Sequence, residues 1–403
     1  MYKSTICLAA LFLSACGSGS SSNTSDTTPS TPVGRITGSA FDSQVYNGLV
    51  DIIGFEEAIP GIVFSSPKTN GQGIFSSSLQ TGSKPISLQV KSGQYLEEAS
   101  LKAVTLNGDI GLMLRSVDYY QAGDTVNLSA TFFTTLATGL TEYLVKEEGL
   151  STEVAIEQAY AEIDAWAGFD TRRTQPVAAY DVANASPFLT DPIKAGFVAG
   201  GISELTRVVG VDSGNGEHSV QTSIGFIALA YEDIKADGLL DGQGSSGQLM
   251  FGNLSITNNT YRTLLSTRML QFLNSDKNQI GLGFDDVLDY ASELNLYAGE
   301  LFNFQAAVDI KETYPTVTQF LPEEGDTISG GYTASALVAD PFGLLSVTYY
   351  IDGQFAAGAG NPYLPFRTIN TLNFTNGLHL IRIDVENFFG NIASVTHSIT
   401  IQN

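Results

Sequence analysis

The chain has 403 residues, of which 43% are hydrophobic and 15% are charged, and this length and composition suit a folded protein with several cores. It carries 42 acidic and 19 basic residues, which gives a formal net charge of −23. A surface this acidic repels a phosphate backbone, so the composition excludes a nucleic-acid-binding protein.

The N-terminus has the pattern of an export signal. Lys3 is followed by an apolar run over residues 6–15, which is too short to span a hydrocarbon core of about 30 Å. The stretch Leu13-Ser14-Ala15-Cys16 resembles the lipobox of bacterial lipoproteins. That resemblance implies that residues 1–15 are removed, that the thiol of Cys16 is diacylglycerylated and that its amine is acylated. The alternative is an ordinary cleaved signal peptide with an incidental cysteine.

The residues after the cleavage site predict how the body is held. In bacterial lipoproteins an aspartate after the cysteine favours the inner membrane, whereas this chain has Gly17. The resemblance therefore implies a lipid-anchored protein of the outer membrane, facing the cell surface, with membrane lipid as its partner through Cys16. Residues 16–33 are rich in Ser, Thr and Gly and have no hydrophobic period, which predicts a flexible tether. The mature chain has no other cysteine, so packing without disulfides has to stabilise it.

Residues 34–125 have the pattern of β-structure. Short alternating runs such as 34–41 and 86–90 are separated by turns rich in Gly and Asn, which predicts a small antiparallel sandwich. The layout resembles the transthyretin-like, carboxypeptidase-regulatory module of exported bacterial proteins. The stretch Gly93-Gln94-Tyr95-Leu96-Glu97-Glu98-Ala99 is similar to a Gly-x-Tyr-x-Asp-Glu-Ala segment that follows this module in bacterial lipoproteins, with Glu97 in place of the aspartate.

Over residues 126–312 the hydrophobic period changes to that of helices. Asp191-Pro192 is a typical helix start, and apolar side chains at helical spacing follow it as far as Gly210. Further helices are predicted at 132–145, from Ser151 to Trp166, and at 219–236, 260–274 and 284–302. These amphipathic helices predict an all-α bundle whose apolar stripes form the core, the alternative being that some of them line a binding pocket.

Residues 313–403 return to β-structure and resemble a bacterial immunoglobulin-like domain. The resemblance rests on the segments 340–353, 361–363 and 375–391, where this chain has Leu378 and Asn387 in place of the threonine and aspartate usual in the family. Alternation also places one set of side chains on a single face of a strand, namely His379, Ile381, Ile383 and Val385. In bacteria such domains are mostly spacers and display modules, and some are adhesive or bind glycans. The predicted fold class is thus multidomain, with an N-terminal β-sandwich, a central helical bundle and a C-terminal immunoglobulin-like sandwich.

The sequence holds no recognisable catalytic constellation. It has no Gly-x-Ser-x-Gly elbow and no His-Glu-x-x-His motif. Its histidines are His218, His379 and His397, and a lone loop histidine such as His218 falls short of the three or four ligands that zinc needs. We therefore predict that the chain has no catalytic residues and is not an enzyme.

One loop has the spacing of a calcium site. Asp233, Asp237 and Asp241 stand at positions 1, 5 and 9 of a 12-residue stretch with Gly238 at position 6, and calcium prefers such clustered oxygens. Lys235 at position 3 and Gly244 at position 12 depart from the pattern. The alternative, which we favour, is a helix that ends at Gly238 and is followed by Asp-Gly turns. Calcium is the only cofactor that the sequence suggests.

The function predicted from these features is that of a surface-displayed binding, adhesion or display module, with a protein or glycan as its ligand. Two other classes stay open. One is a hydrolase with a carboxylate-based site in the helical region, and the other is a purely structural or assembly protein of the envelope.

Overall fold

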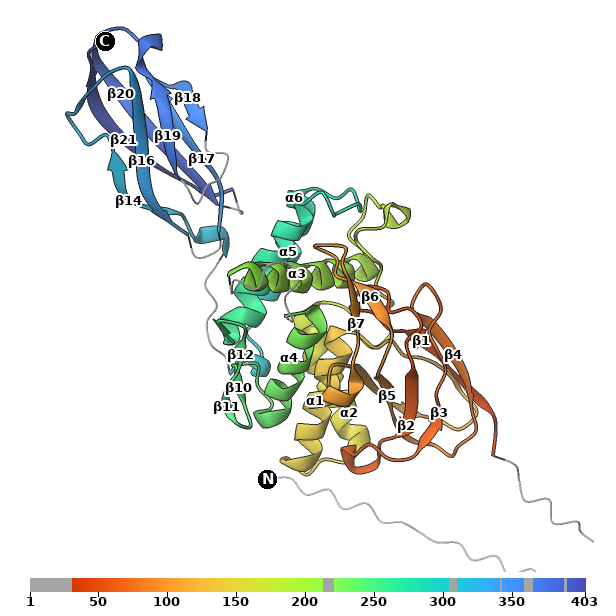
Figure 1. Cartoon of the computed structure of the whole chain (residues 1–403). Helices are drawn as coiled ribbons and strands as arrows, with labels where there is room; N and C mark the ends of the chain where they lie inside the picture. The colour runs from red at the N-terminus through yellow and green to blue at the C-terminus, as the bar shows by residue number, and fades with distance from the viewer. Residues whose placement is uncertain (1–30, 213–220, 304–309, 341–342, 359–364, 388–389) are drawn as a thin grey trace, which may run out of the picture.

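The computed structural model describes residues 31–212, 221–303, 310–340, 343–358, 365–387 and 390–403 (Figure 1). The predicted signal peptide, Cys16, most of the tether and His218 lie outside these ranges. The protein is β-rich with a central helical region, as the sequence predicts. Among the described residues, no helix has the length and apolar character needed to cross a membrane.

The first β-region consists of two facing sheets and a separate hairpin, β6–β7. One sheet has the strand order β3-β2-β5-β8 and the other β4-β1-β9. The strands are β1 (Gly34–Ser39), β2 (Val50–Gly54), β3 (Val63–Ser65), β4 (Ile74–Leu79), β5 (Lys84–Val90), β6 (Gln94–Leu96), β7 (Ala103–Thr105), β8 (Leu114–Tyr120) and β9 (Thr125–Asn127).

The prediction of a purely antiparallel sandwich is wrong for one pair of strands. β1 and β9 pair in parallel, with Arg35 opposite Thr125 and Thr37 opposite Asn127. After β8 the chain turns at residues 121–124, leaves its own sheet and runs along the free edge of β1 in the same direction as that strand. β8 and β9 follow each other in the sequence but belong to different sheets, so β9 pairs with β1, which is far away in the sequence and runs in the same direction.

The predicted helices are present in the central region, at α1 (Phe132–Lys146), α2 (Thr152–Ala167), α3 (Asp191–Asp212), α4 (Ser223–Asp237), α5 (Leu265–Leu273) and α6 (Phe284–Leu296). Polar N-caps begin three of them: Thr131, Ser151 and Thr222 each accept a hydrogen bond from a backbone N–H of the first turn. α6 ends earlier than predicted, because Tyr297 is extended and a short 3-10 turn follows at Glu300–Phe302.

The prediction of an all-α central region needs a second correction. Two short hairpins follow α4, built from β10 (Gln243–Gly244) with β11 (Gly247–Gln248) and from β12 (Met250–Phe251) with β13 (Leu254–Ser255). Gly242 and Gly247 have positive φ angles of 88° and 106° in this stretch. Such backbone favours turns over a continued helix, because a left-handed conformation strains residues with a Cβ.

The β-region and the helices share one hydrophobic core. A continuous cluster of buried side chains runs from Ile36 to Phe302 and draws on both sheets and on α1 to α6. Trp166 lies within it at 2% exposure, with its ring edge-on to Phe133 and Phe302. The β-structure also continues beyond residue 125, where the sequence predicted that the first β-region ends, because β9 and the bridge between Ala40 and Ala130 extend it. In packing, residues 34–303 therefore form one body.

A buried carboxylate joins the β-region to two helices. Glu97 follows β6 and is 7% exposed. Its Oε1 accepts hydrogen bonds from the Tyr95 hydroxyl at 3.0 Å and the Ser223 backbone N–H at 2.8 Å, and its Oε2 accepts from the hydroxyls of Ser203 at 2.7 Å and Ser223 at 2.5 Å. Ser203 belongs to α3 and Ser223 begins α4, so the carboxylate also faces the positive end of the α4 dipole.

Two further buried acids lie beside Glu97. Glu98 Oε2 accepts a hydrogen bond from the Ala179 backbone N–H at 3.0 Å. Burial raises the pKa of the Glu98 carboxyl well above its usual range; the Ala179 N–H opposes this rise and the charge of Glu97 adds to it. Burial also raises the pKa of Asp42, and the charges of Glu97 and Glu98 raise it further. Because of these pKa shifts, the free energy of unfolding of the body depends on pH.

The C-terminal region is a separate sandwich with its own core. A sheet of order β14-β16-β19 faces one of order β15-β21-β20-β17-β18, and the shared core includes Tyr349, Ile383 and Ile399. The strands are β14 (Thr316–Leu321), β15 (Thr327–Ile328), β16 (Gly331–Ala339), β17 (Leu344–Ile351), β18 (Gln354–Gly358), β19 (Phe366–Asn370), β20 (Gly377–Asn387) and β21 (Ile392–Ile401). Figure 1 shows this sandwich projecting from the helical side of the body.

Side-chain amides bind the connecting segment to this sandwich. Asn387 Nδ2 donates to the Thr313 carbonyl at 2.9 Å, and Asn391 Nδ2 donates to the carbonyls of Lys311 at 2.9 Å and Thr313 at 2.7 Å. Lys311 in turn pairs with Asp289 of α6 at 2.7 Å. Asn387 stands where the immunoglobulin-like domains that the sequence resembles usually have an aspartate, and a carboxylate there would have no proton to donate to the Thr313 carbonyl.

The raised pKa of Glu98 gives a prediction about stability. The folded protein keeps a proton on Glu98 at pH values where the unfolded chain has lost it, so the free energy of unfolding falls as pH rises above about 4.3. Glu98→Gln keeps an acceptor for the Ala179 N–H and removes the titration. We expect the free energy of unfolding of this variant to fall less with rising pH, so that the variant is more stable than the wild type at about pH 8.

Urea unfolding at a series of pH values, followed by the fluorescence of Trp166, measures this directly. Glu57→Gln, at an exposed glutamate, is the matched control and should keep the wild-type profile. Identical pH profiles for the wild type and Glu98→Gln would contradict the prediction.

Candidate functional site

One cavity on the body lies where α1, α2, the end of α4 and the turn at Glu300–Phe302 meet. Its volume is about 380 Å³, within the range of pockets that hold small molecules. Leucines form its apolar part, and Leu140, Leu144 and Leu301 are at most 5% exposed. A small apolar group therefore has a preformed place to pack.

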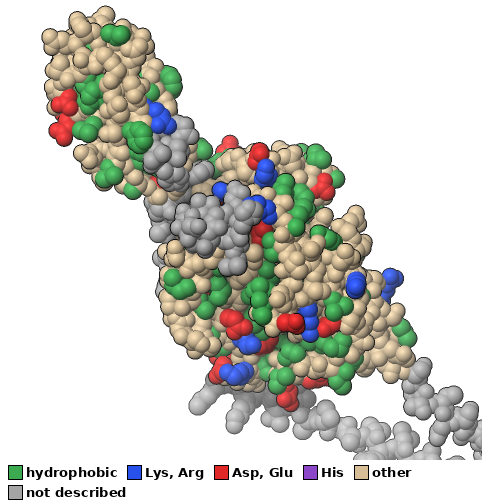
Figure 2. All heavy atoms as spheres, viewed as in Figure 1, with side chains coloured by type: hydrophobic (Ala, Val, Ile, Leu, Met, Phe, Trp, Pro, Cys, Tyr) green, Lys and Arg blue, Asp and Glu red, His purple; other side chains and the backbone are tan. Residues whose placement is uncertain are grey.

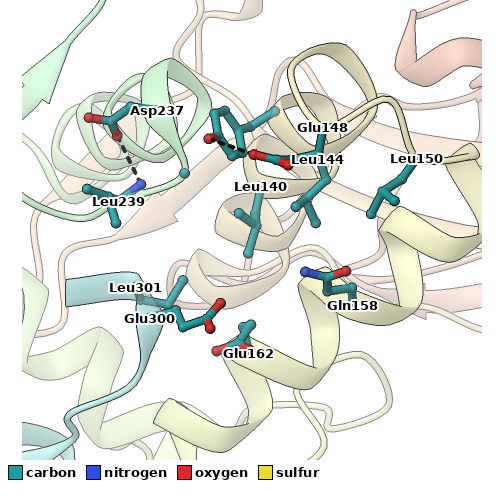
Figure 3. A pocket seen from close by; sticks show the side chains of 12 residues that line it. Leu140, Leu144, Glu148, Leu150, Gln158, Glu162, Asp237, Leu239, Glu300 and Leu301 are labelled. Atoms are coloured by element: carbon teal, nitrogen blue, oxygen red, sulfur yellow. Dashed lines mark hydrogen bonds between the residues drawn. The ribbon is translucent and has the colours of Figure 1, made fainter. Parts of the chain in front are cut away.

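The polar part of this cavity is entirely acidic or neutral. Its carboxylates are Glu148, Glu162, Asp237 and Glu300, and the described lining contains no lysine, arginine or histidine. Figure 3 shows the carboxylates of Glu162 and Glu300 near each other at one edge, below the leucines. We call this site the acidic pocket.

Tyrosine hydroxyls hold two of these carboxylates in place. The Tyr297 hydroxyl donates to Glu162 Oε2 at 3.2 Å, and the Tyr143 hydroxyl donates to Glu148 Oε1 at 3.4 Å. Burial raises the pKa of Tyr297, and the charge of Glu162 raises it further. Both tyrosines therefore remain neutral donors at physiological pH, and they fix the glutamates without cancelling their charge.

Asp237 belongs to the rim in a different way. Its Oδ1 accepts a hydrogen bond from the Leu239 backbone N–H at 3.0 Å, which Figure 3 marks, so the side chain is directed at its own turn. Burial raises the pKa of Asp237, the Leu239 N–H opposes this, and the charge of Asp241 adds to it. Asp237 therefore adds negative charge to the rim of the pocket, but its side chain is not free to bind a ligand directly.

The structure places the three aspartates of the predicted calcium loop in separate local roles. Asp233 is fully buried and accepts a hydrogen bond from the Gly242 N–H at 2.8 Å, while Asp241 accepts one from the Gln243 N–H at 2.8 Å. α4 ends at Asp237, and Gly238 caps it with a φ of 81°. This is the arrangement of the favoured turn interpretation.

The electrostatics of this loop also differ from those of a calcium site. Burial raises the pKa of Asp233 to about 7, and the charges of Asp237 and Asp241 contribute to the rise. Lys235, at the third position of the loop, pairs with Glu142 of α1 at 2.9 Å. Across the described part of the chain, no group of three or more acidic, histidine or cysteine side chains is arranged to hold a metal ion. Calcium binding by Asp233, Asp237 and Asp241 stays a prediction.

Sequence reasoning singled out Asp237 but missed the other acids of the pocket. Glu148 lies in the loop after α1, Glu162 on α2 and Glu300 in the turn after α6, so more than 150 residues of sequence separate them. The available signal was weak: Glu162 falls on the polar side of the predicted Ile156–Ile163 stripe, where an acid normally faces solvent. Only the packing of α1, α2 and α4 brings these residues together.

A second cavity of about 370 Å³ lies on another side of α4. Ile110, Leu112, Leu229 and Phe251 line it, with Gln221 and Glu232 as polar members. It is more apolar than the acidic pocket, and Tyr231, whose hydroxyl donates to Glu142 at 2.7 Å, also lines it. A third cavity beside Asp42 and Phe133 holds only about 20 Å³, which is room for roughly one water molecule.

Comparison with known proteins identifies no family. No family model matches the chain, and no curated protein matches it. Among solved structures, it is similar to fibronectin(III)-like modules of CbhA from Clostridium thermocellum, with 16% identity and a TM-score of 0.19 over 22% of this chain and 47% of that one. It is also similar to CopC from Methylosinus trichosporium OB3b, with 11% identity and a TM-score of 0.18 over 22% of this chain and 94% of that one.

A third likeness is to SGBP-B of the mixed-linkage glucan utilization locus of Bacteroides ovatus, in complex with a mixed-linkage heptasaccharide. The identity is 19% and the TM-score 0.18, over 22% of this chain and 24% of that one. The chain thus spans less than half the length of the first and third of these structures. With TM-scores this low, the likenesses carry no argument about what this chain does.

Proposed function

We propose that the chain is a lipid-anchored protein of the bacterial outer membrane that binds a ligand at the cell surface and does not transform it. The anchor is proposed from the lipobox-like stretch that ends at Cys16 and from the tether after it. The acidic pocket carries the binding part of the proposal, because it combines a preformed apolar cavity with acidic groups held in place.

The chemistry of the pocket favours an organic cation. An ammonium or guanidinium group would lie near Glu162 and Glu300, and its alkyl chain would pack on Leu140, Leu144 and Leu301. The free amines of small polyamines and the side chains of Lys and Arg in a protein partner have this shape. Since Glu300 is exposed and Glu162 only half-buried, each ion pair would contribute on the order of 1 kcal/mol or less. The expected affinity is therefore modest.

The same observations disfavour the hydrolase alternative. A carboxylate-based hydrolase needs an acid with a raised pKa facing its substrate. The carboxyls of Asp42, Glu98 and Asp233, whose pKa values burial raises, do not line the acidic pocket. Asp237 does line it and has a raised pKa, but its Oδ1 accepts a hydrogen bond from the Leu239 N–H, so the side chain is directed at its own turn. A purely structural envelope protein would not need the acidic pocket. Ligand binding in this pocket would therefore also distinguish the proposed binding protein from a structural one.

The anchor is tested by metabolic labelling with a fatty-acid probe in a bacterial host. We expect the wild-type chain to take up label and fractionate with the outer membrane, and Cys16→Ser to lose both properties, since only the thiol accepts the lipid. Label that persists in Cys16→Ser would contradict the proposal, and Cys7→Ser serves as the matched control.

The pocket is tested by calorimetry of the full-length chain with cadaverine and agmatine, and with 1,5-pentanediol as an uncharged analogue. We expect the two amines to bind, the diol not to bind, and binding to weaken as salt is added. The double change Glu162→Gln and Glu300→Gln should weaken amine binding about fivefold to tenfold, because it removes two charges and keeps the cavity shape.

Glu153→Gln, at an exposed position of α2 outside the pocket, is the matched control and should bind as the wild type does. No binding of either amine, or equal binding by the double variant, would overturn the assignment of the pocket.

A further inference from the structure

The outer face of the five-stranded C-terminal sheet carries two aromatic residues on neighbouring strands. Phe355 of β18 lies directly opposite Tyr350 of β17, and its side chain is 67% exposed. The neighbouring residues Tyr349 and Ile351 face inward and are buried, so Tyr350 faces outward. A Cβ placed on Gly358 would lie 3.5 Å from the ring of Phe355, so the ring extends along its own strand. The two rings therefore lie along the sheet surface, beyond the core.

Arg382, whose side chain is held by two neighbours, lies next to these aromatic residues on the adjacent strand β20. Arg382 of β20 is opposite Tyr350, and its guanidinium carbon lies 4.6 Å from the centre of the tyrosine ring. Arg382 also donates to Asp384 Oδ2 at 3.0 Å, and the Ser394 hydroxyl donates to Asp384 Oδ1 at 2.7 Å. The arginine is thus held between a ring and a carboxylate, with the side chain 44% exposed. We call Phe355, Tyr350, Arg382, Asp384 and Ser394 the aromatic platform.

The platform has the properties of a surface that recognises sugars. The pyranose ring has an apolar C–H face that packs on an aromatic ring, and hydroxyl edges that need both donors and acceptors. The platform offers ring faces from Phe355 and Tyr350, N–H donors from Arg382 and carboxylate acceptors from Asp384. Neighbouring strands are about 4.8 Å apart, so the row from Phe355 to Arg382 spans about 10 Å, the length of about two sugar rings.

Charge decides which sugars suit the platform. Arg382 and Asp384 neutralise each other, so the platform has no net charge to attract an ion. The whole chain carries a formal charge of −23, which repels acidic polysaccharides. The same face also exposes the apolar side chains of Leu378, Leu380 and Ile392. Hydroxyls of Thr348, Ser394 and Thr396 interrupt them, so a protein partner would not meet a continuous apolar face.

We propose that the aromatic platform is a binding site for a neutral hexose polysaccharide. This site is distinct from the acidic pocket in position, since it lies on β17, β18, β20 and β21 (Figure 1), and in the chemistry of its ligand. It gives the C-terminal sandwich a role in adhesion to a glycan coat or matrix.

The test is affinity electrophoresis of the full-length chain in a zwitterionic detergent that has no sugar headgroup. The gels contain soluble starch, mannan, dextran or a β-glucan, and pectate as the acidic polysaccharide. We expect at least one neutral polymer to retard the chain and pectate not to. Phe355→Ala should weaken the retardation about tenfold without changing the melting temperature, because the ring is exposed and its loss removes one stacking surface.

Phe366→Ala is the matched control, since Phe366 is a 51% exposed phenylalanine on β19 of the other sheet. It should keep full retardation, and so should the Glu162→Gln and Glu300→Gln double variant of the acidic pocket. The proposal is overturned if no neutral polymer retards the chain, if pectate alone does, or if Phe355→Ala and Phe366→Ala behave alike. A chain that self-associates through this face and binds no polymer would identify it as a protein interface.

Discussion

The arrangement of the body depends on the Glu97 carboxylate and its four donors. These donors come from three separate segments: Tyr95 from β6, Ser203 from α3 and Ser223 from the start of α4. A buried carboxylate is costly unless its hydrogen-bonding capacity is met, and here each oxygen accepts two bonds. Any shift of α3 or α4 relative to the sheets would leave a charge unsatisfied in the interior, so the interaction fixes the position of both helices.

This constraint extends to the acidic pocket. α4 is about 22 Å long, begins at the Glu97 site and ends at Asp237, which lines the pocket. A helix held at one end by buried hydrogen bonds and along its length by the core presents its other end at a defined place. The C-terminal sandwich has its own core, and among the described residues Lys311, in the segment before it, pairs with Asp289 of α6. On the face shown in Figure 2, acidic and basic side chains are interspersed.

Much of the secondary structure was predictable because its signals are local. The caps Thr131 and Ser151, the Asp352-Gly353 turn before β18 and the alternation through His379 to Val385 each act within a few residues. The shared core, the parallel pair of β1 and β9 and the acidic pocket were not predictable, because they depend on contacts between segments that are far apart in the sequence. The Tyr95-to-Ala99 segment stood out in the sequence, but its role needed the positions of Ser203 and Ser223.

We infer that Glu97 makes the first β-region and the helices one cooperative unit. Native-state hydrogen exchange tests it most directly, with the slowest amides of β5, β8, α3 and α4 compared in the wild type, Glu97→Ala and the exposed control Glu57→Ala. The account predicts a common opening free energy in the wild type, lowered by about 2–4 kcal/mol at all four elements in Glu97→Ala and unchanged in the control. Separate opening energies for the sheets and the helices, or a loss confined to residues 95–99, would contradict it.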